Sequence, residues 1–373
     1  GEMAVGRNRA DEGRDLLRKA ARDERVARSA WAELARLSLH VGDARAALAA
    51  AERAAASPAA GDVTGEESIG ATVAYLRMLG PEPLLGMRPG FDGTIVRFLE
   101  REGWRDRGAR EVPVEINGAG SWPVDIDSAY RGNLILSERL ASDLGIRRAG
   151  EFGAAGVGAT APVLEGSLLD EIRIGSLVLR RVPVMVMDSP SFRGEAKGLL
   201  GTGLLKRFDC VLDERAGTFE IRPPGRPDDA GGRIAARAPL FVEGGPIVNA
   251  GLAGGPRRPF LLDTAASVTL LDRGYYERHV KPALPAGAAR EAVVAGAGGR
   301  ETAILIPDLQ AVIGNSGIGR LRVVVLDMSR INRAGGRLAS GIVGGELLRR
   351  YRVHLRFSVP EILLEEYREE PGV

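Results

Sequence analysis

Two segments of the chain repeat one another, and this repetition constrains the fold more than any other feature. Residues 124–129 have the sequence VDIDSA, and residues 260–267 have the sequence FLLDTAAS. In each segment an apolar stretch ends in an aspartate, which is followed by a hydroxyl residue and an alanine. The two aspartates, Asp127 and Asp263, are 263 − 127 = 136 positions apart. Matching motifs at a long, fixed separation predict two structural units built to the same plan.

The repetition continues beyond the aspartates, and its extent argues against coincidence. Residues 198–205 have the sequence GLLGTGLL, and residues 341–348 have GIVGGELL, which is 341 − 198 = 143 positions later. Between these landmarks each unit has, in the same order, a glycine-rich patch (153–158; 296–299), a short strand with a turn (172–175; 312–314) and an apolar strand ending in aspartate (182–188; 321–327). Five landmarks in one order predict an internal duplication.

The local patterns indicate strands with one short helix in each unit. Residues 182–187 and 323–326 are short apolar runs between turn residues, which is typical of buried strands. Residues 137–145 begin with a serine that can cap a helix, continue with an acidic first turn and end in glycine. These signals predict a short helix, and residues 272–279 are expected to form its counterpart.

An apolar strand ending in Asp-Ser/Thr, a glycine-rich flap and a later apolar-apolar-Gly segment resemble a lobe of the bacterial retropepsin-like and pepsin-like aspartic peptidases. The resemblance extends from about residue 112 to about residue 366. It implies a mainly β fold, a bilobal pepsin-like double barrel. The helical periodicity of the N-terminal residues adds a small α-helical domain before it. The expected domains are a tetratricopeptide-like helical domain (1–80), a linker with the first strand (81–111), protease lobe 1 (112–228) and protease lobe 2 (229–373).

The resemblance also implies a chemistry, that of an aspartic endopeptidase. Asp127 and Asp263 would hold one water between them in the cleft between the lobes. Two carboxylates that close cannot both ionise, and aspartic proteases are the standard example of such a dyad. The ionised member would accept a proton from the water, and the protonated member would donate to the scissile carbonyl. No metal or cofactor is implied, and the partner would be a peptide or protein substrate.

Residues beside the aspartates are expected to support the two loops. By resemblance, Ser128 and Thr264 hydrogen-bond across the twofold axis. Gly201 and Gly344 correspond to glycines beneath the loops, where the absence of a Cβ lets two backbone segments approach closely.

The chain departs from the family at the residue after the hydroxyl, where glycine is replaced by Ala129 and Ala265. A Cβ at this point would crowd the water or push the loop into a less favourable backbone conformation. The departure leaves two alternatives open: an active peptidase, or a catalytically inactive peptide-binding protein on the same fold.

Further residues are candidates for binding substrate. Tyr130 and Arg131 follow the first motif, where the second unit has small residues. Flap positions are expected in the glycine-rich patches, because glycine permits a flap to open and close over substrate. The flap candidates are Gly156, Val157, Gly158, Gly296, Ala297 and Gly298.

The N-terminal region has a different composition. Residues 9–79 are rich in Ala, Arg, Glu and Leu with helical periodicity, and residues 30–54 resemble one tetratricopeptide hairpin. This region is either a module that binds a protein partner, or a helical brace on the β body. A third interpretation of the whole chain is a protein-interaction scaffold. Because repeat arrays need several units for stability, the brace is favoured. Residues 80–83 (GPEP) mark the boundary.

Composition excludes other classes. Lys and Arg total 51 and Asp and Glu total 49, and this net charge of +2 argues against a nucleic-acid surface. No apolar run reaches the roughly 18 residues of a transmembrane helix. The three histidines lack metal-site spacing and are expected at the surface or at helix ends: His40, His279 and His354. The resemblance implies export, with a signal removed, although the sequence itself does not set the compartment.

Overall fold

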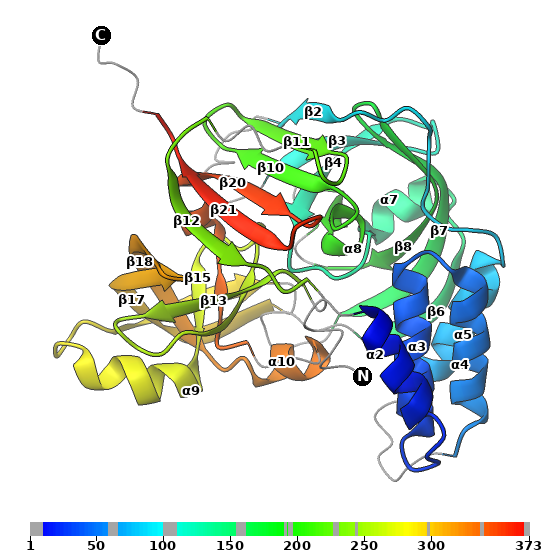
Figure 1. Cartoon of the computed structure of the whole chain (residues 1–373), viewed down its shortest axis with the longest axis horizontal. Helices are drawn as coiled ribbons and strands as arrows, with labels where there is room; N and C mark the ends of the chain where they lie inside the picture. Colours follow the sequence, from blue (N-terminus) through cyan, green and yellow to red (C-terminus); the bar gives the residue numbers. More distant parts are fainter. Residues whose placement is uncertain are drawn as a thin grey trace.

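The computed structural model describes most of the chain (Figure 1). The described residues are 10–58, 66–99, 110–153, 162–189, 192, 197–226, 231–242, 245–296, 299–335 and 339–368. Among these described residues, four N-terminal helices stand beside a body made of strands, and the described strands form three sheets (Figure 1). The predicted fold class, a mainly β body preceded by a small helical region, is confirmed.

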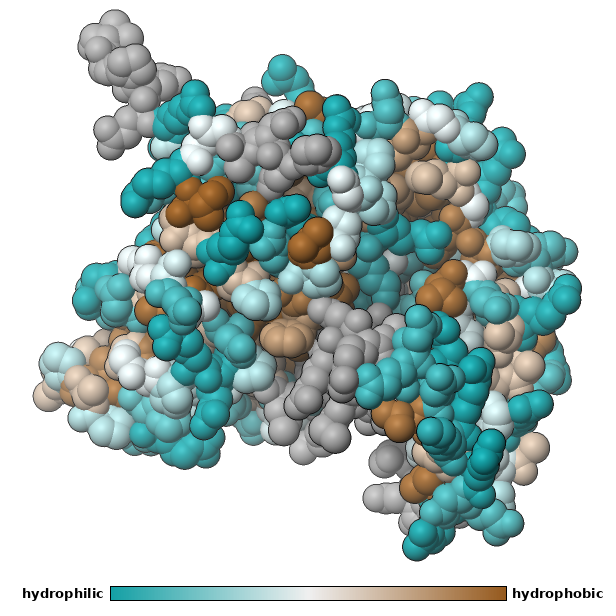
Figure 2. All heavy atoms as spheres, viewed as in Figure 1, coloured by the Kyte–Doolittle hydropathy of each residue, from teal (hydrophilic) through white to brown (hydrophobic). Residues whose placement is uncertain are grey.

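The described part of the helical region contains α2 (Ala10–Ala20), α3 (Ala27–His40), α4 (Ala44–Ala56) and α5 (Glu66–Leu79). At the turn between α3 and α4, Gly42 has a φ of +85°, and the Asp43 carboxylate accepts the Ala46 N–H at 2.9 Å. The buried face of α4 is lined with alanines, so the helices approach closely. On the face drawn in Figure 2, the helices are covered largely by hydrophilic residues.

The first lobe is a sheet with strand order β1-β8-β5-β9-β4-β3-β7-β6, and pairing of β7 with β8 closes it into a barrel. Its strands are β1 (Gly86–Met87), β3 (Glu111–Ile116), β4 (Ser121–Asp127), β5 (Leu134–Ser137), β6 (Arg148–Gly153), β7 (Val163–Ile174), β8 (Leu177–Met187) and β9 (Gly198–Gly201). Parallel pairs β4–β9 and β5–β8 flank the antiparallel pair β5–β9.

The second lobe repeats this arrangement, with strand order β13-β14-β19-β15-β18-β17-β16 and closure by the pair β13–β17. Its strands are β13 (Ile247–Leu252), β14 (Arg258–Leu262), β15 (Thr269–Asp272), β16 (Arg290–Gly296), β17 (Gly299–Ile313), β18 (Ser316–Leu326) and β19 (Gly341–Val343). The pairs β14–β19 and β15–β18 are parallel and β15–β19 is antiparallel, as in the first lobe.

The turns match as well as the strands. Gly175 and Gly314, at the matched turns after β7 and β17, both have a φ of +56°. Asn117 and Ala253, which are 253 − 117 = 136 positions apart, have φ values of +49° and +50°. Two L-residues in the left-handed region at equivalent turns are uncommon. The two lobes therefore share backbone detail as well as topology.

The predicted helices after each aspartate motif are confirmed. In the first lobe, α7 (Glu138–Asp143) is capped by the Ser137 side chain, which accepts the Leu140 N–H. In the second lobe, α9 (Arg273–Tyr275) is capped by Asp272 and continues into the wider turn η3 (Tyr276–Val280) and then η4 (Lys281–Ala283). In the described part of the lobes, further helices follow strands: α8 (Thr202–Leu205), α10 (Ser329–Gly335) and α11 (Gly345–Leu348).

A six-stranded sheet with order β12-β21-β20-β10-β11-β2 joins the two halves. Its strands are β2 (Thr94–Arg97), β10 (Asp209–Asp213), β11 (Thr218–Arg222), β12 (Ile234–Pro239), β20 (Tyr351–Arg356) and β21 (Glu361–Glu366). Its central pair, β10 with β20, brings one strand from each half together. The expected surface position of His354 is wrong. This residue is fully buried in β20, and its Nε2 lies 2.7 Å from Glu365 Oε2.

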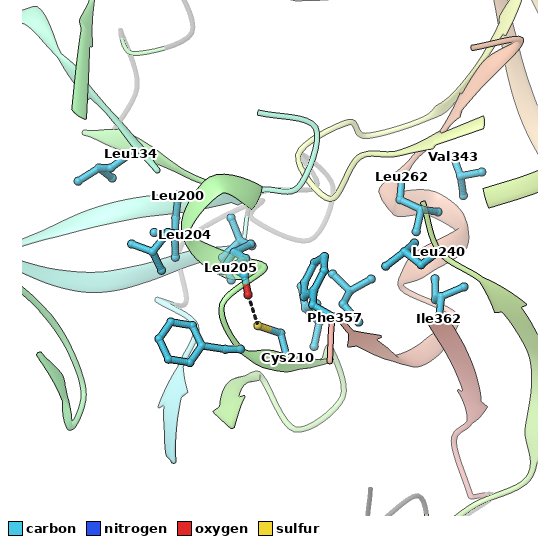
Figure 3. Close-up of a cluster of buried hydrophobic side chains, with 14 of the residues drawn as sticks. Leu134, Leu200, Leu204, Leu205, Cys210, Leu240, Leu262, Val343, Phe357 and Ile362 are labelled. Carbon is cyan, nitrogen blue, oxygen red and sulfur yellow. Dashed lines mark hydrogen bonds between the residues drawn. The ribbon is translucent and has the colours of Figure 1, made fainter. Parts of the chain in front are cut away.

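A shared core lies where the three sheets meet (Figure 3). Leu200 and Leu204 from the first lobe and Leu262 and Val343 from the second lobe are all buried in one apolar cluster. Cys210 of the joining sheet lies between them. Burial of apolar surface stabilises the folded state by roughly 25 cal/mol per Å². A core shared by both lobes therefore opposes their separation.

Candidate active site

Asp127 is the last residue of β4, and its carboxylate is held by its own loop. Its Oδ1 accepts the N–H of Ala129 at 2.9 Å and the N–H of Tyr130 at 3.0 Å. The residue is half-buried. β4 pairs in parallel with β9 and places Asp127 opposite Gly201.

Asp263 directly follows β14 and has the same environment. Its Oδ1 accepts the N–H groups of Ala265 and Ala266, each at 2.9 Å. Its own N–H donates to the Val343 carbonyl of β19 at 3.0 Å. The carboxylates of both motif aspartates are therefore oriented by two backbone donors in loops of equal length.

Ser128 and Thr264 connect the two loops by reciprocal hydrogen bonds. The Ser128 N–H donates to Thr264 Oγ1, and the Thr264 N–H donates to Ser128 Oγ, both at 3.0 Å. Each hydroxyl then donates to a carbonyl of the opposite lobe: Ser128 to Leu262 at 2.8 Å, and Thr264 to Ile126. Both side chains are buried, so these bonds are costly to break. They fix the two aspartate loops against each other.

The two carboxylates interact electrostatically. Burial raises the pKa of Asp127 well above its usual value, and the charge of Asp263 raises it further. Backbone donors from Tyr130 and Ala129 oppose this increase in pKa without cancelling it. Asp127 therefore keeps its proton at a pH where an ordinary aspartate has lost it, which is the property of one member of a coupled pair.

Gly201 and Gly344 lie where backbones cross beneath the loops. A Cβ on Gly201 would lie 2.2 Å from the Gly132 carbonyl oxygen, and a Cβ on Gly344 would lie 2.1 Å from the Val268 carbonyl oxygen. Both distances are far inside van der Waals contact with backbone atoms, which cannot rotate away. Each lobe thus requires glycine at this position.

The alanines that replace glycine fit their loops. Neither Ala129 nor Ala265 is among the residues with positive φ, so the methyl groups impose no left-handed strain. Their amides donate to Asp127 and Asp263 at 2.9 Å. Of the two expected consequences of a Cβ, the strained backbone conformation is therefore not observed.

Tyr130 and Arg131 point to different surroundings. A Cβ on Gly132 would lie 2.1 Å from the Tyr130 hydroxyl, and one on Gly201 would lie 2.4 Å from the Tyr130 ring. The ring is thus folded back over its own loop. Burial raises the pKa of the Tyr130 hydroxyl, and the neighbouring Asp127 charge adds to the effect. Arg131 interacts electrostatically with Glu33 of α3, so it faces the helical region.

The helical region contacts the hairpin formed by β6 and β7. A Cβ on Gly166 would lie 2.3 Å from the Tyr75 ring of α5, and Tyr75 packs edge-on against Phe152 with ring centres 5.8 Å apart. A Cβ on Gly150 would lie 2.4 Å from the Ala71 carbonyl oxygen. These close contacts support the role of a brace for the helices.

Most of the expected flap positions belong to segments that the structure does not describe. Gly156, Val157, Gly158, Ala297 and Gly298 lie outside the described residues. Gly296 ends β16 and pairs with Gly299 of β17.

Within the described ranges, no group of three or more His, Cys, Asp or Glu side chains is arranged to hold a metal ion. In the same part of the chain, no helix is long and apolar enough to cross a membrane.

Two buried charged residues near the dyad were not predicted as site residues. Arg110, just before β3, is 1% exposed, and its N–H donates to Asp125 Oδ1 at 2.7 Å. Burial raises the pKa of Asp125 to about 7, against the opposing Arg110 hydrogen bond. The sequence does contain a signal for this pair. At the positions 136 residues later, the second unit has the apolar residues Pro246 and Leu261 in place of Arg110 and Asp125.

Comparison with known proteins agrees with this geometry for the first lobe. Residues 112–204 match a family model described as aspartyl protease. No curated protein matches the chain. Among solved structures, the aspartic proteinase from Irpex lacteus is similar, with 12% sequence identity and a TM-score of 0.47. That similarity covers 74% of this chain and 97% of the other.

Proposed function

We propose that the protein is an aspartic endopeptidase whose catalytic pair is Asp127 and Asp263. The observation that carries the proposal is the reciprocal bonding of Ser128 and Thr264, both at 3.0 Å, which holds two identically oriented carboxylates in facing loops. The aspartyl protease match over residues 112–204 supports the first half of the site. The matched topology of the lobes supports an origin by internal duplication.

The chemistry follows from the unequal protonation of the pair. The ionised carboxylate accepts a proton from the water while the water oxygen attacks the scissile carbonyl carbon. The protonated carboxyl donates its proton to the carbonyl oxygen, so a neutral tetrahedral intermediate forms. The carboxyl that took the proton of the water then donates it to the amide nitrogen, while the other carboxylate accepts a hydroxyl proton from the intermediate. The C–N bond breaks, an amine and a carboxylic acid are released, and both carboxyl groups return to their starting protonation. General acid–base assistance of this kind contributes roughly 10² to 10⁴ in rate.

An extended peptide is the proposed substrate, bound across the cleft between the lobes. The intact amides of Ala129 and Ala265 favour an active site over a catalytically silent one, because they orient both carboxylates without strain. The contact of Tyr75 with Phe152 favours a bracing role of the helices over a scaffold for partner proteins.

The test is cleavage of a quenched fluorescent peptide library from pH 3 to pH 7, with and without pepstatin. We expect pepstatin-sensitive cleavage that is lost in Asp263→Asn. The matched control is Asp308→Asn, which changes an exposed aspartate of the second lobe that pairs with Arg320 at the surface. Cleavage that persists in Asp263→Asn would contradict the proposed chemistry. Peptide binding without any cleavage by the wild type would favour the silent binding protein.

A further inference from the structure

The two active-site loops differ in the group that contacts the carbonyl after each aspartate. The Ser128 carbonyl accepts a hydrogen bond from the Thr202 hydroxyl, which is neutral. The Thr264 carbonyl accepts a hydrogen bond from Nη1 of the Arg110 guanidinium, which is charged. The pseudo-twofold symmetry of the loops is therefore broken directly beneath the dyad.

Gly345 is the residue that permits this difference. The Thr202 N–H donates to the Tyr130 carbonyl, and the Gly345 N–H donates to the Ala266 carbonyl, so Thr202 and Gly345 are equivalent. A Cβ on Gly345 would lie 2.9 Å from Arg110 Nη2. In the second lobe the missing side chain thus leaves room for the guanidinium.

Arg110 reaches this position from the first lobe. Its carbonyl accepts the Ile126 N–H, just as the Pro246 carbonyl accepts the Leu262 N–H, so Arg110 and Pro246 are equivalent. At the equivalent position of the second lobe, Pro246 carries no charge, so among the described residues the cation comes from the first lobe. The guanidinium also pairs with Glu214 after β10. The arginine is thus held on several sides and oriented toward the second lobe.

A hydrogen-bonded chain connects this cation to Asp263. The Thr264 carbonyl and the Ala265 N–H belong to the same peptide group, and that N–H donates to Asp263 Oδ1 at 2.9 Å. A charged donor at one end polarises the peptide and strengthens the N–H at the other end. In the first lobe the equivalent chain starts from the neutral Thr202 hydroxyl and ends at Asp127.

We propose that Arg110 is a positioning residue that makes Asp263 the ionised member of the dyad and leaves Asp127 as the protonated member. The inference rests on the proposed peptidase function for its catalytic meaning. Under that function, Asp263 accepts the proton of the water, and Asp127 donates to the scissile carbonyl. The protonation order itself is a property of the folded protein and does not require turnover.

The charged neighbours of the dyad agree with this assignment. Among the described residues, the charges of Asp263 and Asp125 both oppose the ionisation of Asp127. Asp125 in turn interacts with Arg110 and with Glu111. Glu214 forms an ion pair with the Arg110 guanidinium.

The first experiment is a titration of the wild-type protein by carboxyl ¹³C NMR with labelled aspartate. The two dyad signals are assigned by their loss in Asp127→Asn and Asp263→Asn. We expect the Asp263 signal to titrate first, with Asp127 ionising about one pH unit or more higher, the shift typical of a charge-assisted contact. Earlier ionisation of Asp127 overturns the proposal, whether or not any variant of Arg110 folds.

The second experiment removes the charge while keeping a donor. Arg110→Gln combined with Glu214→Gln leaves the net charge of the buried network unchanged. We expect the Asp263 titration to rise by about one pH unit, and the acidic limb of the kcat/KM profile to move by the same amount. Arg110→Lys with Glu214 intact keeps the cation, so its Asp263 titration should stay close to that of the wild type. Thr202→Val is the matched control and should leave Asp263 unchanged.

The outcomes separate the two proposals. A folded double variant with an unchanged titration order and separation overturns the role of Arg110, even if peptides are still cleaved. A wild type in which Asp263 ionises first but which cleaves no peptide supports the role of Arg110 and contradicts the proposed peptidase function.

Discussion

The loop after β4 and the loop after β14 have the same internal hydrogen bonds, but different groups hold them from beneath. In both loops the aspartate Oδ1 accepts two backbone N–H groups. The hydroxyl of the next residue donates a hydrogen bond to a carbonyl of the opposite lobe. Beneath the first loop lies the Thr202 hydroxyl, and beneath the second lies the Arg110 guanidinium. The comparison teaches that matched loops bring two carboxylates together, while unmatched supports can give them different roles.

The largest expected effect tests whether the two aspartates are equally necessary. Asp127→Asn and Asp263→Asn should each lower kcat/KM for peptide cleavage by roughly 10² to 10⁴, because each removes one partner of the acid–base pair. The measurement is steady-state cleavage of one fluorescent peptide by both variants. Substantial activity in one of the two would show that only a single carboxylate is catalytic, and the comparison of the loops would then carry no mechanistic meaning.

The next effect tests the backbone crossings. Gly201→Ala and Gly344→Ala should each lower the free energy of unfolding by about 3 kcal/mol, because each Cβ would collide with a carbonyl oxygen at 2.2 or 2.1 Å. The measurement is urea unfolding followed by circular dichroism. Gly86→Ala in β1 is the control, since a Cβ there has no atom within 4 Å. Similar losses of unfolding free energy in Gly201→Ala and Gly344→Ala would support the structural equivalence of the two lobes. A loss in only one variant would show that the two backbone crossings are not equally tight.

The reciprocal bonds between the loops predict a smaller loss. Ser128→Ala should lower the free energy of unfolding by about 2 kcal/mol, because the buried Thr264 N–H loses its acceptor. Thr264→Val should have a similar cost, since it removes the acceptor of the Ser128 N–H. Thr264→Ser keeps the hydroxyl and is the control. Chemical unfolding of the three variants is the measurement. A Thr264→Ser variant as unstable as Thr264→Val would attribute the loss to the methyl group instead.

The charged side of the comparison predicts a pH effect from Asp125, which is replaced by Leu261 in the second lobe. The unfolded carboxyl loses its proton near its usual pKa of 3.8, whereas the folded one holds it up to about 7. The folded state therefore binds more protons in this window. The stability that Asp125 contributes is fully present below the unfolded pKa of 3.8. It is lost as the pH rises through the folded pKa of about 7.

We accordingly expect the free energy of unfolding to fall between pH 4 and pH 7, with Asp125 contributing at most about 1.4 kcal/mol per pH unit. Asp125→Asn should flatten this slope and still accept the Arg110 N–H through its amide oxygen. The measurement is urea unfolding at several pH values. Parallel curves for wild type and variant would assign the slope to other groups.

The smallest expected effect concerns the helices, which contact the β6–β7 hairpin of the first lobe. Tyr75→Leu removes the ring contact with Phe152, which is worth about 1 kcal/mol. Amide hydrogen exchange in β6 and β7 should become about fivefold faster, while exchange in β16 and β17 stays the same. Equal acceleration in both hairpins would indicate a global loss of stability and would remove the case for a local brace.

Much of the fold could be predicted because its signals are local and are repeated. The apolar runs at 182–187 and 323–326 and the capped helices after each motif follow from short-range patterns. His354 shows where such patterns fail. Its burial depends on β20 lying in the middle of a sheet built from both halves, with Glu365 on the neighbouring strand. Local periodicity carries no information about such a long-range pairing.

The candidate site also has a part that the local sequence predicts and a part that it does not. The motif places Asp127 and Asp263 at the ends of two apolar strands, and a shared spacing indicates that they are counterparts. The guanidinium of Arg110 lies beneath Thr264, although the two residues are 154 positions apart. Nothing in the immediate sequence around Arg110 marks that contact, because the room for it comes from the missing side chain of Gly345.

The sequence by itself determined the two repeated units, their many strands and the two aspartates. These features follow from hydrophobic periodicity, turn residues and repeated motifs, which are all local patterns in the sequence. Only the tertiary structure decided that Ala129 and Ala265 fit without backbone strain, and that Arg110 and Asp125 lie beneath one side of the dyad. The physical reason is that dihedral strain and buried charge depend on which backbones cross and which space stays open. Those relations exist only after distant segments have packed together.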